Sequence, residues 1–88
     1  MLAQNEINFP VEFTFKVIMD NAKSVNECTK NLKILFVSLK ISFSEILSNA
    51  SRNGNYNSFS SNVKIQDRSQ FDLLYKEARN LPGVKFAV

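Results

Sequence analysis

The strongest fold signal in the sequence is the stretch VEFTFKVIM, residues 11–19. Apolar side chains recur at every second position from Val11 onward, and Glu12, Thr14 and Lys16 stand between them. A period of two, rich in aromatic and β-branched residues, is typical of a half-buried β-strand. The stretch therefore predicts a strand with one face on a core and the other toward solvent.

The segment that follows this strand has the periodicity of a helix. Asn21 or Ser24 can cap its first turn with a side-chain oxygen. Apolar residues then recur at a spacing of about 3.6 residues; they are Val25, Cys28, Leu32, Leu35, Phe36 and Leu39. The opposite arc carries Lys23, Asn26, Glu27, Lys30 and Lys33, with Ile34 as an apolar exception. We expect a helix over about residues 24–37.

The second expected strand, ISFSEILS over residues 41–48, alternates only in part. Phe43 and Leu47 share a face, but the same face would also carry the charged Glu45. Either the strand bulges near Glu45, so that Ile46 turns inward, or it frays there. The residues alone leave its register open.

A hairpin and a third strand come next. The polar stretch NASRNGN contains Gly54, which can adopt the positive φ of a tight turn. The segment YNSFSSNVKI, residues 56–65, then places Phe59 and Val63 on one face with Ser61 between them. This alternation predicts a strand whose apolar face meets the same core.

The last third of the chain predicts a second helix. Asp67 and Gln70 have the spacing of a capping box, in which two side chains satisfy free amides reciprocally. Asp72 and Lys76 stand four residues apart on the solvent side, where such a pair supports a helix. The apolar stripe consists of Phe71, Leu74, Tyr75, Ala78 and Leu81.

Pro82 and Gly83 end this helix, and a short final strand follows. The strand pattern places Val84, Phe86 and Val88 on one face and Lys85 and Ala87 on the other. The element order is therefore β-α-β-β-α-β, an α+β chain. Handedness rules then favour the ferredoxin-like sandwich, a four-stranded antiparallel sheet with both helices on one face.

We expect a single domain over residues 1–88, with residues 1–9 frayed and the core over about residues 10–88. The sheet face away from the helices is expected to be polar and open. Its residues are Glu12, Thr14, Lys16, Ser42, Ser44, Ser58, Ser60, Asn62 and Lys64.

Composition excludes several kinds of catalytic and metal site. The chain has no His and one Cys, so it can form no Ser-His-Asp triad, no Cys-His pair, no imidazole metal site and no internal disulfide. Cys28 lies on the apolar arc of the first helix and is expected to be a buried small hydrophobe. The carboxylates are scattered over separate elements, whereas acid–base catalysis needs groups that converge. We therefore expect no enzyme, no catalytic residue, no metal and no cofactor.

Charge and hydropathy bear on location. Eleven Lys and Arg against eight Asp and Glu give a net charge of +3, a mild excess. No apolar run reaches the roughly 18–20 residues of a membrane span, and the opening residues lack the features of a secretory signal. Together with the free thiol, this predicts a cytoplasmic protein with no membrane partner.

Two surfaces bear on nucleic-acid binding. RRM-type sheets stack bases on aromatic residues of the two central strands. Here those outward positions hold Thr14, Lys16, Ser58 and Ser60, with Tyr56 as the only aromatic residue, so base stacking is not expected. The first helix offers a basic face of Lys23, Lys30 and Lys33, extended by Lys40. A nucleic-acid-binding module that uses this face is the alternative hypothesis, although such faces are more often solvated surface.

Two motifs resemble a known family. Phe9-Pro10, followed by Phe13, Lys16 and Val17, is similar to an F-P-x-x-F-x-x-K-V opening. Gly54-Asn55-Tyr56-x-Ser58 is similar to a G-N-Y-x-S segment that leads into the third strand. In this order, with a helix between them, the motifs resemble the YbeD-like family of small bacterial proteins. The resemblance covers about residues 9–88.

The resemblance implies a ferredoxin-like fold close to ACT regulatory domains. Such domains bind amino acids or other small effectors near the first strand–helix turn, which here holds Asp20, Asn21 and Lys23. The family also carries a loose label of lipoate-linked regulator.

We therefore expect a non-catalytic regulatory or adaptor module of the ACT-like type. A second polar site is expected at the hairpin, on Asn55, Tyr56 and Ser58. The expected partners are a second copy of the chain, met through a sheet edge or a helix face, and a protein that the module regulates. Ile34 is the candidate contact on the helix face.

Overall fold

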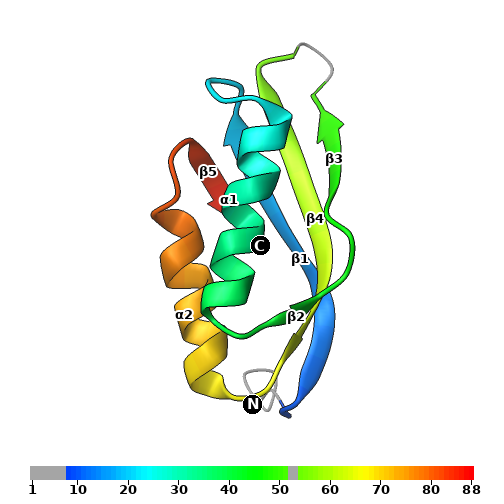
Figure 1. Ribbon diagram of the computed structural model, residues 1–88, viewed down its shortest axis with the longest axis vertical. Coiled ribbons are helices and arrows are strands. Elements are labelled where there is room, and N and C mark those ends of the chain that lie inside the picture. The colour runs from blue at the N-terminus through cyan, green and yellow to red at the C-terminus, as the bar shows by residue number, and fades with distance from the viewer. Residues whose placement is uncertain (1–7, 52–53) are drawn as a thin grey trace, which may run out of the picture.

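The sheet is built around β1 (Val11–Asp20) in the computed structural model, which describes residues 8–51 and 54–88 (Figure 1). β1 pairs antiparallel with β4 (Tyr56–Ile65) along its whole length and, on its other side, with β5 (Val84–Ala87). β4 pairs on its outer side with both β2 (Ser42–Phe43) and β3 (Leu47–Ala50). β2 and β3 share one sheet position, so the predicted four-stranded antiparallel arrangement holds, with its second strand in two pieces.

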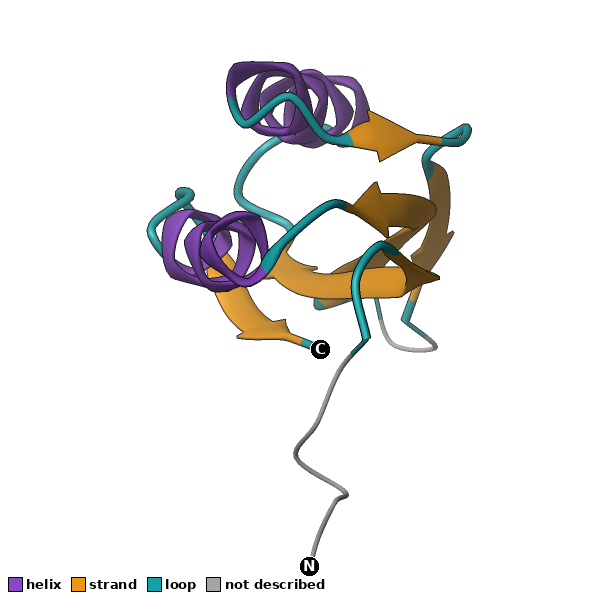
Figure 2. Ribbon diagram, turned by 90° about the horizontal axis from the view of Figure 1, so that it is seen from below, coloured by secondary structure: helices purple, strands orange, loops and turns teal. Residues whose placement is uncertain are grey.

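Two helices cover one face of the sheet. Figure 2 looks along α1 (Val25–Ser38) and α2 (Arg68–Arg79) and shows both on the same side. Of the two caps that the sequence offers for α1, Ser24 takes the role: its Oγ accepts a hydrogen bond of 3.1 Å from the N–H of Glu27. The predicted α+β, ferredoxin-like architecture is therefore confirmed.

The core lies between the helices and the sheet and is aromatic at its centre. The ring of Phe15 meets those of Phe36 and Tyr75 edge-on, with centroids 6.2 and 5.2 Å apart. The buried apolar residues are Phe15, Val17, Met19, Cys28, Leu32, Leu35, Phe36, Ile41, Phe59, Val63, Ile65, Leu74 and Ala78. The odd-numbered apolar residues of β1 and β4 face this core, as their alternation predicts.

Phe9 also packs on the core, with its ring centroid 6.2 Å from that of Phe71. Residues 1–7 lie outside the described residues, and so does the fraying predicted for them.

A one-residue bulge separates β2 from β3. Phe43 stands opposite Val63 and Leu47 opposite Ser60, so one strand advances four residues while its partner advances three. This is the first of the two alternatives for the second strand, and Ile46 indeed packs against the core. The expectation for Leu47 is wrong: the extra residue reverses the alternation, and its side chain is 58% exposed on the open face.

Ser61 holds this bulge in place. It is a buried polar residue within the apolar core, 4% exposed, and its Oγ donates a hydrogen bond of 2.8 Å to the carbonyl of Ser44. The Oγ of Ser44 in turn accepts from the N–H of Asn62 at 3.0 Å. The bulge leaves the carbonyl of Ser44 in need of a hydrogen-bond donor, and the hydroxyl of Ser61 supplies it. This explains why a serine stands in the middle of an apolar strand face.

A second bulge lies in β5. Ile18 pairs with Phe86, but Met19 pairs with Val84, so Lys85 is the extra residue. The predicted common face of Val84, Phe86 and Val88 is therefore wrong. Val84 packs on the core, whereas the bulge turns Phe86 and Val88 to the open face, where they are 66% and 63% exposed.

Gln70 joins the start of α2 to the end of α1. Its N–H donates to Asp67 Oδ1 at 2.8 Å, which is the first half of the predicted capping box. The second half differs, because Gln70 Oε1 accepts from the N–H of Gln66, at 2.7 Å, and not from that of Asp67. Its Nε2 donates to the carbonyls of Leu39 and Lys40 at 2.9 and 3.1 Å. One side chain thereby satisfies backbone groups at the ends of both helices.

The predicted ion pair on α2 also has a different partner. Asp72 contacts Arg68 Nε at 3.3 Å rather than Lys76. Both cations are four residues from Asp72, so helical spacing alone does not choose between them. The pair is exposed and contributes little to stability.

Candidate functional site

Three connecting segments meet at one end of β1. Asp20, the last residue of β1, stands opposite Tyr56 and donates its N–H to the carbonyl of Gly83 at 2.8 Å. Asn21 Nδ2 donates to the carbonyl of Gly54 at 2.6 Å. The β1–α1 turn, the β3–β4 hairpin and the α2–β5 turn are therefore linked by hydrogen bonds, and Figure 1 shows the first two at the same end of the molecule.

Asp20 lies at the centre of this meeting point. Its Oδ1 accepts a hydrogen bond of 3.1 Å from the N–H of Ala22. A Cβ atom on Gly83, which has a φ of +85°, would lie 2.9 Å from the same oxygen. Gly83 is thus required here both by its backbone conformation and by the close approach of Asp20.

The three residues predicted to bind an effector make different contacts. Asp20 and Asn21 join the β1–α1 turn to the hairpin and the α2–β5 turn. Lys23 instead contacts Glu27 Oε2 at 3.5 Å on the first turn of α1. Asp20 and Asn21 are therefore the members of the predicted set that the fold brings to the hairpin.

The predicted hairpin site lies next to them. Tyr56 and Ser58 occupy successive outward positions of β4, and Asn55 is exposed directly before the strand. Tyr56 and Ser58 line a shallow hollow of about 220 Å³ on the open sheet face. Lys16 and Ile18 of β1 line the same hollow. The fold thus places Asp20 and Asn21 beside the predicted hairpin site, although Asp20 does not line the hollow.

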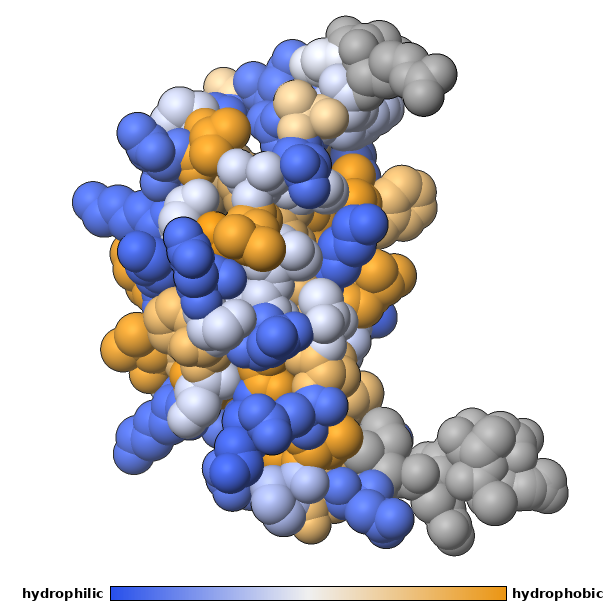
Figure 3. All heavy atoms as spheres, turned by 90° about the vertical axis from the view of Figure 1, so that its right-hand side faces the viewer, coloured by the Kyte–Doolittle hydropathy of each residue, from blue (hydrophilic) through white to orange (hydrophobic). Residues whose placement is uncertain are grey.

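Apolar side chains on the open face are the part that sequence reasoning missed. Ile18 stands opposite Phe86, and the backbone of Lys16 exchanges two hydrogen bonds of 2.8 Å with Val88. Figure 3 views the β3 edge of the sheet and shows apolar side chains among hydrophilic ones there as well. No signal in the sequence reveals the exposure of Phe86, because the regular alternation of the last strand conceals the β5 bulge.

Cys28 has no features of a reactive thiol. It is 2% exposed within the core, and burial, with a smaller contribution from Glu27 and Asp20, raises the pKa of its thiol. A raised pKa disfavours the nucleophilic thiolate. The predicted structural role of Cys28 is therefore consistent with its surroundings.

Three of the four lysines of the predicted basic face are exposed and one is paired. Lys30, Lys33 and Lys40 are exposed, and the ion pairs of the described residues involve none of them. Lys23 is instead held by Glu27.

Comparison with known proteins places the chain in a family. A family model described as "Protein of unknown function (DUF493)" matches residues 4–88. The chain belongs to this family. The match confirms the resemblance to YbeD-like proteins that the two motifs carry. A comparison with curated proteins gave no match.

Solved structures agree on the fold of this DUF493 chain. Protein HP0495 of Helicobacter pylori matches with a TM-score of 0.73 at 21% identity, over 98% of this chain and 89% of that one. The ACT domain from a GTP pyrophosphokinase of Chlorobium tepidum matches with a TM-score of 0.68 at 10% identity, over 88% and 94%. The C-terminal domain of the MgtC protein of Mycobacterium tuberculosis matches with a TM-score of 0.65 at 11% identity, over 94% and 89%. At these identities the likeness is one of fold, which is ACT-like.

Neither helix in the described part of this family member is long and apolar enough to cross a membrane.

Proposed function

We propose that this protein is a small regulatory or adaptor module of the ACT-like type, which binds a small effector or a partner protein and performs no catalysis. The observation that carries the proposal is the meeting of the β1–α1 turn, the hairpin and the α2–β5 turn at Asp20. Loops held by a rigid sheet are where binding residues concentrate. The ACT-like fold and the family membership support a regulatory module.

The surface beside Asp20 suits a ligand that carries both charges. Lys16, Ile18 and Asp20 occupy successive outward positions of β1. An ammonium, an apolar side chain and a carboxylate therefore follow one another along the strand, with the hydroxyls of Tyr56 and Ser58 on the neighbouring strand. A small ligand with an amino group, a carboxylate and a short apolar part has a partner here for each of its groups. Free amino acids, the class that the ACT resemblance implies, have this chemistry.

Binding would be measured by thermal unfolding and titration calorimetry with each of the twenty amino acids and with lipoate. A ligand at one hundred times its Kd stabilises the folded state by about 2.7 kcal/mol. We expect at least one amino acid to give such a shift, and Lys16→Ala and Asp20→Asn to weaken its binding at least tenfold. Lys64→Ala, at the other end of the same sheet face, is the control and should bind as the wild type does. The proposed effector site is wrong if no compound raises the midpoint or if both variants bind normally.

Self-association through the β3 edge belongs to the same proposal. Leu47, Ser48, Asn49 and Ala50 are all exposed, and this edge strand has neither the charge nor the proline that commonly protects an edge. Ser51 donates its N–H to the carbonyl of Tyr56, so the N–H of Ala50, one residue earlier, points away from β4. Size-exclusion chromatography with light scattering should show a dimer that Ala50→Pro converts to a monomer. A wild-type monomer at all concentrations would contradict this part of the proposal.

Regulation would act in trans, on a separate partner protein, and we place the module in the cytoplasm, where its free thiol stays reduced. The alternative of a nucleic-acid-binding module is supported by the unpaired lysines of α1. Salt-dependent retention on RNA or DNA, abolished by charge reversal of Lys30 and Lys33, would favour it.

A further inference from the structure

The outer face of α1 combines positive charge with exposed apolar side chains. Ile34 and Val37 are 56% and 66% exposed, and each lies four residues after a lysine, Lys30 and Lys33 respectively. Residues three and four apart are neighbours on a helix surface, so these four side chains form one contiguous patch. Lys40, two residues after the last residue of α1, adds a third lysine at the Val37 end of the helix. We call these five residues the α1 patch.

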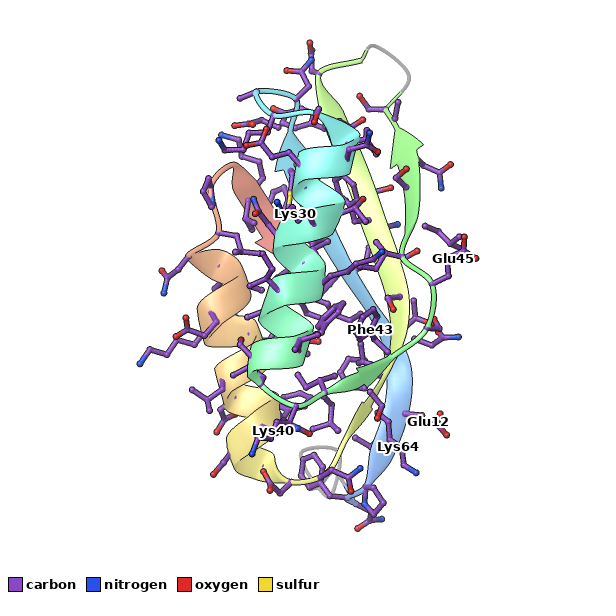
Figure 4. All side chains as sticks on the ribbon, in the orientation of Figure 1. Glu12, Lys30, Lys40, Phe43, Glu45 and Lys64 are labelled. Carbon is purple, nitrogen blue, oxygen red and sulfur yellow. The ribbon has the colours of Figure 1, made fainter. Side chains whose placement is uncertain are left out.

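Charge along this stretch of the chain has one sign. Between Glu27 and Glu45 the chain contains three lysines and no acidic residue. Glu27 is neutralised by Lys23 one turn before the patch begins. Figure 4 shows Lys30 on α1 and Lys40 just beyond its lower end, whereas the acidic Glu12 and Glu45 lie on the side of the sheet edge. The patch therefore presents uncompensated positive charge around an apolar centre.

The combination of positive charge and apolar side chains favours some binding partners of the α1 patch over others. A second copy of the chain would bring Lys30, Lys33 and Lys40 against like charges, which is unfavourable when ions are desolvated. A phosphate backbone would match the lysines but would leave Ile34 and Val37 without an apolar partner. A peptide segment that carries both carboxylates and apolar side chains matches both halves of the patch.

We propose that the α1 patch is a docking surface for an acidic amphipathic segment of a partner protein. Ile34 and Val37 bury the apolar side chains of that segment, and the three lysines pair with its carboxylates. The patch lies on the outer face of the helix layer, whereas the effector hollow lies on the open face of the sheet. The two proposals can therefore fail separately.

The test is a selection of displayed random fifteen-residue peptides against the full chain, with counter-selection against the Ile34→Asp/Lys33→Glu double variant. We expect the enriched peptides to combine Asp and Glu with large apolar residues. Fluorescence anisotropy of a labelled enriched peptide should show at least tenfold weaker binding to Ile34→Asp and to the Lys30→Glu/Lys33→Glu variant. Leu73→Asp and Lys76→Glu, exposed residues of the same types on α2, are the matched controls and should bind normally.

Several results would overturn the proposal. One is the absence of enriched peptides, and another is enrichment of sequences without acidic residues. Equal binding by wild type and Ile34→Asp would place the peptide elsewhere. Two further probes test the other occupants: a fifteen-nucleotide single-stranded RNA, and vesicles of phosphatidylglycerol. If either binds wild type but not the double-lysine variant, and Ile34→Asp binds it normally, the patch is an anion site and not a peptide dock. Retention of folding in each variant is checked by its urea unfolding midpoint.

Discussion

The Oγ of Ser61 donates a hydrogen bond of 2.8 Å to the carbonyl oxygen of Ser44, and this contact joins the middle of β4 to the bulge between β2 and β3. The bulge decides which side chains of the second strand face the core, since it turns Ile46 inward and Leu47 outward. A single hydroxyl thus supports the register of the whole sheet edge.

Removal of this hydroxyl should destabilise the fold. Ser61→Ala loses the hydrogen bond to Ser44, which is worth about 1 kcal/mol. Ser60→Ala, the neighbouring serine on the opposite sheet face, is the control and should change stability by less than about 0.5 kcal/mol. Urea unfolding at pH 7 measures both. Equal effects from the two variants would mean that Ser61 does not hold the bulge.

The β5 bulge predicts that two phenylalanines behave very differently. Phe86→Ala should cost less than about 0.5 kcal/mol, because its ring is already in solvent. Phe59→Ala should cost about 3–5 kcal/mol, because it removes a fully buried ring and leaves a cavity. The urea unfolding midpoints of the two variants measure the difference in stability. A large loss in Phe86→Ala would show that its ring packs inward as the simple alternation suggests.

Lys40 occupies a position that favours glycine. It has a φ of 59° directly after α1, and the backbone closes there with hydrogen bonds from Lys40 N–H to Val37 O and from Ile41 N–H to Phe36 O, of 3.0 and 2.9 Å. A left-handed residue costs about 1–2 kcal/mol, whereas glycine also gains freedom in the unfolded chain. Lys40→Gly should therefore stabilise the protein by roughly 0.5–1 kcal/mol net. Lys33→Gly, inside the helix, should instead destabilise it by about 1 kcal/mol.

Alanine substitutions at Gly83 and Gly54 together test how firmly Asp20 is held in the candidate site. Both have positive φ, so Ala is strained at either, by about 1 kcal/mol. Only at Gly83 would the new Cβ also press on Asp20 Oδ1. Gly83→Ala should therefore cost about 1 kcal/mol more than Gly54→Ala, the worth of the hydrogen bond between Asp20 and Ala22. If the two variants are equally stable, Asp20 is free to move and the site is less rigid than its contacts indicate.

The buried thiol predicts a pH dependence of stability. Burial raises the pKa of Cys28, so the folded state keeps the proton at a pH where the unfolded chain has lost it. The resulting stabilisation is fully present below pH 9.0, the ordinary pKa of the thiol, and is lost as the pH rises through the folded pKa. Between pH 7 and pH 10 the urea midpoint of the wild type should fall further than that of Cys28→Ala. Parallel declines would contradict a buried, protonated thiol.

Most of the fold could be predicted because periodicity reports burial directly. The alternation in residues 11–19 and the spacing from Val25 to Leu39 each describe one apolar face, and one face is what each element buries. The bulges could not be predicted in the same way. Whether Phe86 or Ala87 faces the core depends on where an extra residue is accommodated between β1 and β5, which is a property of two strands together.

The residues of the candidate site could likewise be predicted in part from the sequence. Asp20, Asn21, Tyr56 and Ser58 could be named from the sequence, through the resemblance and the hairpin pattern. Their meeting could not, because Asn21 and Gly54 are 33 positions apart along the chain. The role of Lys16 and Ile18 beside them follows only from the pairing of β1 with β4.

The sequence by itself determined the order of elements, the helix-backed sheet and the absence of imidazole chemistry, since these depend on local periodicity and residue type. Only the tertiary structure decided the two bulges, the exposure of Phe86 and Leu47, and the joining of two predicted sites at Asp20. Strand register and loop contact are set by segments distant in sequence, and their free energy appears only when those segments pack together.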